Sequence, residues 1–144
     1  MTCTFFGHRN TPDGAEVPLR KVIAALIEHH GADIFYVGHQ GKFDYMVRRV
    51  LKEVKRIYPH ITYFVVLAYM PGVRNVVDMT DYSDTIYPDG LENTPPKFAV
   101  VKRNRWLVEH SDTVITYVDH TSGGAAQFKE LAEKKGKWVI NLAN

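Results

Sequence analysis

The chain has a single cysteine, Cys3, among its 144 residues, so it cannot form an internal disulfide. Cys3 lies in an apolar opening segment, which favours a buried, inert thiol over a reactive one. No apolar run approaches the length of a membrane-spanning helix, and no basic-then-apolar leader opens the sequence. These absences predict a cytoplasmic protein with no membrane partner.

The chain also lacks a dense block of basic residues. Its 18 Lys and Arg residues and 16 Asp and Glu residues are mixed along the sequence and leave a formal net charge of +2. A dedicated nucleic-acid-binding protein usually concentrates its positive charge. We therefore do not expect nucleic acid to be the partner.

Several catalytic motifs are absent as well. The sequence contains no GxxxxGK[ST] loop of the P-loop NTPases, no GxSxG nucleophile elbow and no GxGxxG dinucleotide fingerprint. Acidic residues between positions 69 and 96 could bind a metal, but no ligands at metal-binding spacing accompany them. The sequence thus predicts neither a metal site nor a cofactor.

What is present is an alternation of short apolar segments with segments of helical periodicity. The apolar segments are 2–6, 33–37, 61–68, 113–117 and 138–142, with a short extra strand at 84–87. The helical segments are 18–30, 43–57, 97–110 and 124–135. This pattern predicts an α/β, Rossmann-like three-layer sandwich, with a mainly parallel sheet flanked by helices on both faces. We expect one domain over residues 1–144, with a long loop or lid at 69–96.

Three turns follow the predicted strands, at the carboxyl ends where parallel sheets bind ligands. They combine glycine with side chains that form hydrogen bonds: Gly7-His8-Arg9, Gly38-His39-Gln40-Gly41 and Thr121-Ser122-Gly123-Gly124. For each turn alone, a change of chain direction is the simpler explanation of its glycines. Together the turns predict a site for a phosphate-bearing ligand.

The side chains of these turns have chemistry that fits such a site. Arg9 can bind a phosphate through two hydrogen bonds, and His8 and His39 can donate to an oxygen or carry a proton. For His8, a functional role and an ordinary loop position are equally compatible with the sequence. Asp44 begins the helix after the second turn, where it suits helix capping and ligand binding equally.

The order of four motifs resembles the SLOG superfamily, a Rossmann-like group that includes the Lonely Guy phosphoribohydrolases and the DNA-processing Smf proteins. The motifs are GHR, GHQGKFD, RNRWLVEHSDTVITYV and SGGAAQ. The likeness spans nearly the whole chain and is closest to small bacterial and phage members. It implies a Rossmann-like fold that binds a nucleotide or a nucleotide-derived ligand.

The same resemblance implies roles for individual residues. Lonely Guy enzymes cleave the N-glycosidic bond of nucleoside 5′-monophosphates, and their helix arginine and signature glutamate match Arg103 and Glu130. Their PGGxGTxxE signature is altered here, with Ser122 for proline, Ala126 for the third glycine and Gln127 for threonine.

Helical spacing separates the two matched residues. Arg103 borders a buried stripe and could reach the end of the sheet. Glu130 lies on the opposite side of its helix from Phe128, so it would meet a ligand only if another helix or a second subunit covered it. An ordinary solvated glutamate is the simpler alternative, and the outward placement favours a homodimer.

The leading prediction is a protein that binds a nucleotide-like, phosphate-bearing small molecule. One alternative is a nucleoside 5′-monophosphate phosphoribohydrolase with Arg103 and Glu130 as its catalytic residues, and another is a non-catalytic scaffold or interaction module. The predicted ligand-binding residues are Gly7, His8, Arg9, Gly38, His39, Gly41, Asp44, Thr121, Ser122, Gly123, Gly124 and Gln127.

Overall fold

The computed structural model describes residues 1–69 and 84–143, and these residues form one six-stranded sheet. The strands are β1 (Thr2–Gly7), β2 (Ile34–Val37), β3 (Thr62–Val66), β4 (Thr85–Ile86), β5 (Thr113–Tyr117) and β6 (Trp138–Asn141). Their order is β4-β3-β2-β1-β5-β6, and every neighbouring pair is parallel. The predicted parallel α/β sheet is confirmed.

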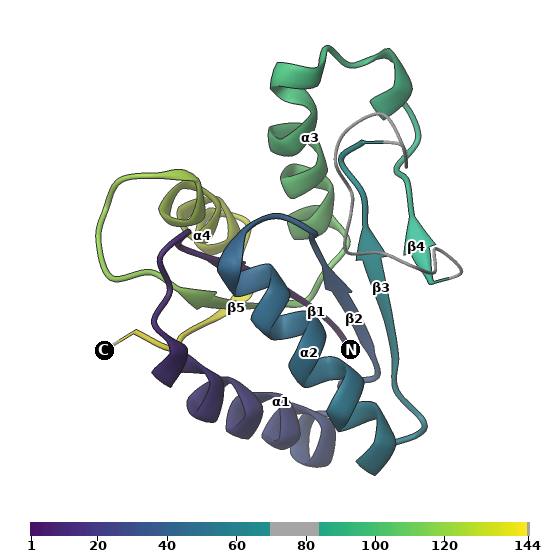
Figure 1. Ribbon diagram of the computed structural model, residues 1–144, viewed down its shortest axis with the longest axis vertical. Helices are drawn as coiled ribbons and strands as arrows, with labels where there is room; N and C mark the ends of the chain where they lie inside the picture. Colours follow the sequence, from purple (N-terminus) through teal and green to yellow (C-terminus); the bar gives the residue numbers. More distant parts are fainter. Residues whose placement is uncertain (70–83, 144) are drawn as a thin grey trace.

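Helices cover both faces of this sheet. They are α1 (Glu16–His30), α2 (Gly41–Ile57), α3 (Pro96–Glu109) and α4 (Gly124–Lys134), with short 3-10 turns at Asp13–Ala15 and Leu91–Asn93. Figure 1 shows α1 and α2 side by side on one face. There Leu19 and Val47 pack with Phe5, whereas Leu107 of α3 packs with Phe6 on the other face. Since successive strand residues point to opposite faces, Phe5 and Phe6 divide the core into two layers.

Helix α2 forms because its apolar residues recur at helical spacing. Six of them are buried: Phe43, Met46, Val47, Val50, Leu51 and Val54. Ile57 belongs to the same stripe by its spacing, yet it is exposed, because it is the last residue of the helix and extends beyond the core. The stripe therefore fixes which face of α2 meets the sheet.

The strand order creates a switch point between β1 and β5. From β1 the chain continues through α1 to β2 on one side, and from β5 it continues through α4 to β6 on the other. The connections therefore part at the carboxyl ends of β1 and β5, which is where ligands bind in open parallel sheets. In Figure 1 these ends lie near the first turns of α2 and α4.

The observed elements agree with the predicted ones to within a few residues at each end. The strand predicted at 84–87 is β4, while the strand predicted at 61–68 is shorter and ends at Val66. Much of the predicted loop or lid at 69–96 falls in residues 70–83, outside the described residues. None of the helices in the described part of the chain is long and apolar enough to cross a membrane.

Candidate functional site

A hollow of about 470 Å³ opens at the switch point between β1 and β5. It is lined by residues from all three strand-end turns and from α3, namely Gly7, His8, Arg9, Asn10, Gln40, Gly41, Val100, His120, Gly123, Gly124 and Ala125. Within the described residues, Arg9 is exposed and has no ion-pair partner. The structure thus brings the three predicted turns to one place.

Two glycines of these turns are required by packing inside the protein. A Cβ atom on Gly7 would lie 2.2 Å from the Phe43 ring, and one on Gly38 would lie 2.5 Å from Oδ2 of Asp44. Both distances are far below normal contact, so neither position has room for a side chain. The sequence predicted both glycines as ligand-binding residues, whereas the packing shows that they allow α2 to approach the sheet.

His8 forms a compact cluster with two residues that follow β5. Its Nε2 atom accepts a hydrogen bond from the backbone N–H of Asp119 at 3.0 Å. The His8 and His120 rings stack with their centroids 3.5 Å apart, and Nδ1 of His120 lies 2.7 Å from Oδ1 of Asp119. Burial, and then the neighbouring His120, lower the pKa of His8 below its usual value. His8 is therefore held as a neutral ring at the wall of the hollow.

His39 does not line this hollow. Its Nε2 atom accepts the backbone N–H of Ala68 at 3.1 Å, which ties the turn after β2 to the chain beyond β3. Burial, and then the charge of Arg103, lower the pKa of His39 from 6.5 to about 4. A neutral His39 is thus part of the fold, although the sequence predicted it as a ligand-binding residue.

Asp44 and Arg103 form the buried floor beneath the turns. Oδ2 of Asp44 accepts the backbone N–H of Gln40 at 3.0 Å. Arg103 donates to the carbonyl oxygen of Val66 at 2.8 Å, to Oε1 of Gln40 at 2.7 Å and to Oδ1 of Asn104 at 2.8 Å. Burial raises the pKa of Asp44, and the nearby Arg103 opposes this change.

Of the two roles left open for Asp44, the hydrogen bond to Gln40 matches capping. Arg103 does reach the end of the sheet, as its helical position predicted, but its three donor groups bind protein atoms. Both side chains also line a smaller hollow of about 120 Å³ beside the first one.

The Gly-Gly turn contributes backbone to the site. Gly123 and Gly124 line the hollow at the start of α4, where the first backbone N–H groups of a helix have no intrahelical partner. Thr121, Ser122 and Gln127 are exposed and do not line it. This turn thus lines the hollow with its backbone and not with the side chains of Thr121 and Ser122.

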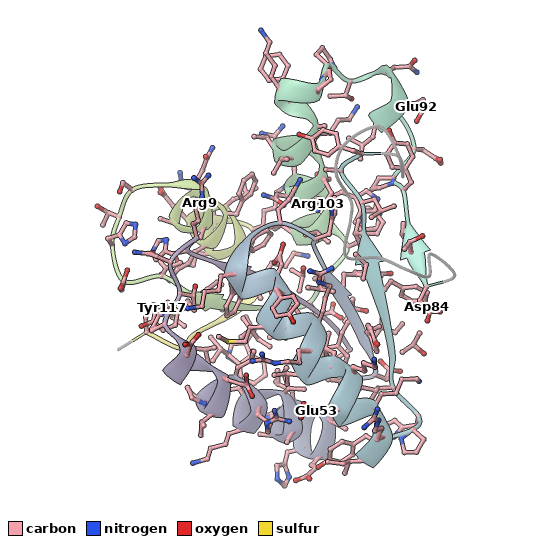
Figure 2. All side chains as sticks on the ribbon, viewed as in Figure 1. Arg9, Glu53, Asp84, Glu92, Arg103 and Tyr117 are labelled. Carbon is pink, nitrogen blue, oxygen red and sulfur yellow. The ribbon has the colours of Figure 1, made fainter. Side chains whose placement is uncertain are left out.

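Glu130 lies on the exposed face of α4, as its helical position predicted. Its side chain is 66% exposed and forms an ion pair of 3.2 Å with Lys134, one turn along the helix. Figure 2 shows Arg9 and Arg103 at about the same height in the view, with Glu53 of α2 below them. Arg103 and Glu130 share none of the described hollows.

The predicted site omitted Asn10, Gln40, Asp119 and His120. All four follow the carboxyl ends of strands, the same signal that identified the three turns. Asp119 and His120 directly precede the Gly-Gly turn, so a consistent use of the strand-end rule would have included them. Their contact with His8 depends on β1 and β5 being neighbours.

Comparison with known proteins finds solved structures that have the same fold. No family model matches the chain, and no curated protein matches it. Solved structures do match, among them DNA processing protein A from Helicobacter pylori, described for its single-stranded DNA binding mode, and DNA processing protein A from Streptococcus pneumoniae. The chain has the fold of these DNA processing proteins.

The likeness covers almost the whole of this chain. The TM-score is 0.68 in both cases, with 16% identity over 98% of this chain for the Helicobacter pylori protein. For the Streptococcus pneumoniae protein the identity is 18% over 97% of this chain. The chain spans 64% and 49% of those two proteins, respectively. The resemblance to the superfamily of the DNA-processing Smf proteins is confirmed for the fold.

These matches correct two predictions. The solved structures that share the fold are DNA processing proteins, and one is described as binding single-stranded DNA. The prediction of a nucleotide-like small ligand is therefore wrong, and so is its phosphoribohydrolase alternative. The expectation that nucleic acid is not the partner is also wrong, since the Helicobacter pylori protein with this fold is described as binding single-stranded DNA.

Proposed function

We propose that this chain binds single-stranded DNA across the carboxyl edge of its sheet. The observation that carries the proposal is the hollow at the switch point, which combines the exposed Arg9 with the starts of two helices. The description of the Helicobacter pylori protein as a single-stranded DNA binder supports the choice of this partner.

The hollow offers groups that suit the sugar-phosphate backbone. The Arg9 guanidinium can donate two parallel hydrogen bonds to one phosphate. The first backbone N–H groups of α2, at Gly41, and of α4, at Gly124, lie at the positive ends of their helix dipoles. Contacts of this kind position a strand without reading its sequence.

A second set of residues on α2 suits the bases. Tyr45 lies one turn beyond Gly41 and is 52% exposed. The guanidinium carbons of Arg48 and Arg49 each lie 5.8 Å from the centroid of its ring. An exposed aromatic ring beside a cationic group can stack with a base while the cation meets a phosphate, and unpaired bases are free to stack only in a single strand.

The proposal is tested by fluorescence anisotropy with a labelled oligothymidylate of about 16 nucleotides, which covers the usual site sizes of single-strand-binding domains. A duplex of the same length and thymidine monophosphate serve as competitors at low salt. We expect the single strand to bind at least about tenfold more tightly than the duplex, with affinity falling as salt rises. No anisotropy change at micromolar protein, or equal binding of duplex, would contradict the proposal.

The predicted homodimer also remains a proposal. β6 is an outer strand of the sheet, and Trp138 at its start is 45% exposed. An edge strand leaves backbone groups unpaired along one side, so it can pair with a second copy. Sedimentation equilibrium of the wild type and of Trp138→Glu tests this, because a dimer through β6 would dissociate in the variant.

A further inference from the structure

Three side chains with metal-binding chemistry meet at the ends of β1 and β5. They are His8, which is buried, and Asp119 and His120, which are exposed. We propose that His8, Asp119 and His120 bind a divalent transition-metal ion of the Zn²⁺ type at the rim of the hollow. This inference does not depend on the proposed DNA binding.

The spacing of the donor atoms fits one ion. One ligand atom from each residue can be chosen so that all three lie within 4.8 Å of one another. Nε2 of His8 is 3.4 Å from Oδ1 of Asp119, and Nδ1 of His120 is 2.7 Å from the same oxygen. Ligands bound to Zn²⁺ at its normal bond lengths in a tetrahedron lie about 3.3 Å apart. The three donor atoms therefore lie close enough together for side-chain rotation to bring them around one ion.

The backbone fixes where these ligands stand. The N–H of His8 donates to the carbonyl oxygen of Tyr117 at 3.2 Å, which extends the pairing of β1 with β5 by one residue. The side-chain amide of Asn141 binds both the N–H and the carbonyl oxygen of Val118, each at 2.9 Å. Residues on both sides of the proposed site are thus anchored to the sheet, an arrangement that orients metal ligands.

Metal binding would change two contacts that exist in the structure. The lone pair of His8 Nε2 accepts the N–H of Asp119, and the His8 and His120 rings are nearly parallel, at 12°. Because an ion binds in the plane of each imidazole, His120 would have to turn out of the stack. Its side chain is 48% exposed and has room to do so.

The donor set also determines which ions fit. Two imidazole nitrogens and one carboxylate oxygen suit Zn²⁺, Co²⁺ or Ni²⁺, whereas Mg²⁺ and Ca²⁺ prefer oxygen ligands. Three protein ligands leave a fourth position open, as in sites that bind a water molecule or an anionic oxygen. His8 and His120 line the hollow that Arg9 also lines, and Asp119 lines a second hollow that it shares with His120.

The test is isothermal titration calorimetry of the full chain, stripped with EDTA and dialysed, against ZnCl₂ and MgCl₂. We expect one Zn²⁺ per chain, no heat of binding for Mg²⁺, and visible absorption from the Co²⁺ complex. His8→Ala, Asp119→Asn and His120→Ala should each weaken Zn²⁺ binding about tenfold or more. The exposed His60, which is remote in the sequence from all three ligands, provides the control His60→Ala.

Two of the variants leave the buried core untouched. Asp119 is 56% exposed and His120 is exposed, so Asp119→Asn and His120→Ala should fold even if His8→Ala does not. Absence of Zn²⁺ binding, or affinity unchanged in these two variants, would overturn the site, as would an equal loss in His60→Ala. DNA binding measured in EDTA reports on the proposed function separately.

Discussion

Arg103 of α3 donates from Nη1 to the carbonyl oxygen of Val66 at 2.8 Å and so ties this helix to the end of β3. The guanidinium is buried and also approaches Asp44, whose carboxylate lies beneath the same turn. Removing it would leave a buried carboxylate without its nearby cation and a buried carbonyl oxygen without its donor. Substituting Arg103 therefore tests how much its buried hydrogen bonds stabilise the structure beneath the hollow.

We expect Arg103→Ala to lower the free energy of unfolding by about 2 kcal/mol or more, because it leaves the buried carbonyl oxygen of Val66 without its hydrogen-bond donor. Arg105→Ala removes the same type of side chain two residues along α3, where it is exposed, and should change stability by no more than about 0.5 kcal/mol. Urea denaturation followed by circular dichroism measures both. Similar losses in the two variants would show that the buried bonds of Arg103 contribute little.

A methyl group at Gly38 tests how tightly this turn packs against Asp44 and Arg103. The new Cβ would lie 2.5 Å from Oδ2 of Asp44 and 3.1 Å from the Arg103 guanidinium. Gly38→Ala should therefore destabilise the protein by about 2 kcal/mol through overpacking. Gly14→Ala meets nothing within 4 Å, so it should stabilise by about 0.5 kcal/mol by restricting the unfolded chain. Thermal unfolding should show a lower Tm for Gly38→Ala and a higher Tm for Gly14→Ala. Equal changes in Tm would show that Gly38 is not tightly packed.

His39 should make stability depend on pH. Its pKa falls from 6.5 in the unfolded chain to about 4 in the fold because it is buried next to Arg103. The unfolded state therefore binds the proton more tightly, so the contribution is full above pH 6.5 and is lost as pH falls toward 4. We expect a loss of about 3 kcal/mol over this window.

His39→Gln provides the control for this effect. Its amide oxygen can accept the N–H of Ala68 and does not titrate, so the variant should lose less stability between pH 7 and pH 4 than the wild type. Urea unfolding at several pH values isolates His39, since the other titrating groups, including His8, are common to both proteins. Parallel curves would mean that His39 does not titrate as its burial implies.

The fold was readable from the sequence because local patterns encode it. The stripe of α2 and the apolar run of β5 are periodic signals within single segments, and strict alternation with helices implies parallel strands. Ile57 is exposed although its spacing places it on the buried stripe, because periodicity assigns a residue to a face of the helix and does not show where the core ends. The order of strands, in contrast, is a property of the whole chain.

The site was only partly readable for that reason. The three turns were found because glycine after a strand is a local signal, but the contact between His8 and His120 joins residues that are far apart in sequence. The same holds for the bond between Arg103 and Val66. Nucleic acid was not expected as the partner, because basic and acidic residues are mixed along the chain and leave a net charge of only +2.

Arg9 should carry part of the salt dependence of DNA binding. If it neutralises one phosphate, Arg9→Ala weakens binding at low salt and reduces the slope of log affinity against log salt by about 0.7, the value for a single strand. Arg56→Ala removes an equal charge from the last turn of α2, far along the helix from Gly41 in the hollow. Salt titrations by fluorescence anisotropy should leave its slope at the wild-type value. A slope that falls equally in both variants would indicate only a general effect of net charge.

Tyr45 should contribute to DNA binding in a different way, through stacking with a base. Tyr45→Ala should weaken binding of the single strand about fivefold or more, since one stacked base contributes about 1 to 3 kcal/mol. The salt slope should stay unchanged, because the substitution removes no charge. Phe98→Ala on α3 is the matched control, as Phe98 is also 52% exposed and lies next to a lysine, with Lys97 Nζ 5.0 Å from its ring. If Phe98→Ala weakened DNA binding more than Tyr45→Ala, the single-stranded DNA would lie along α3 and not along α2.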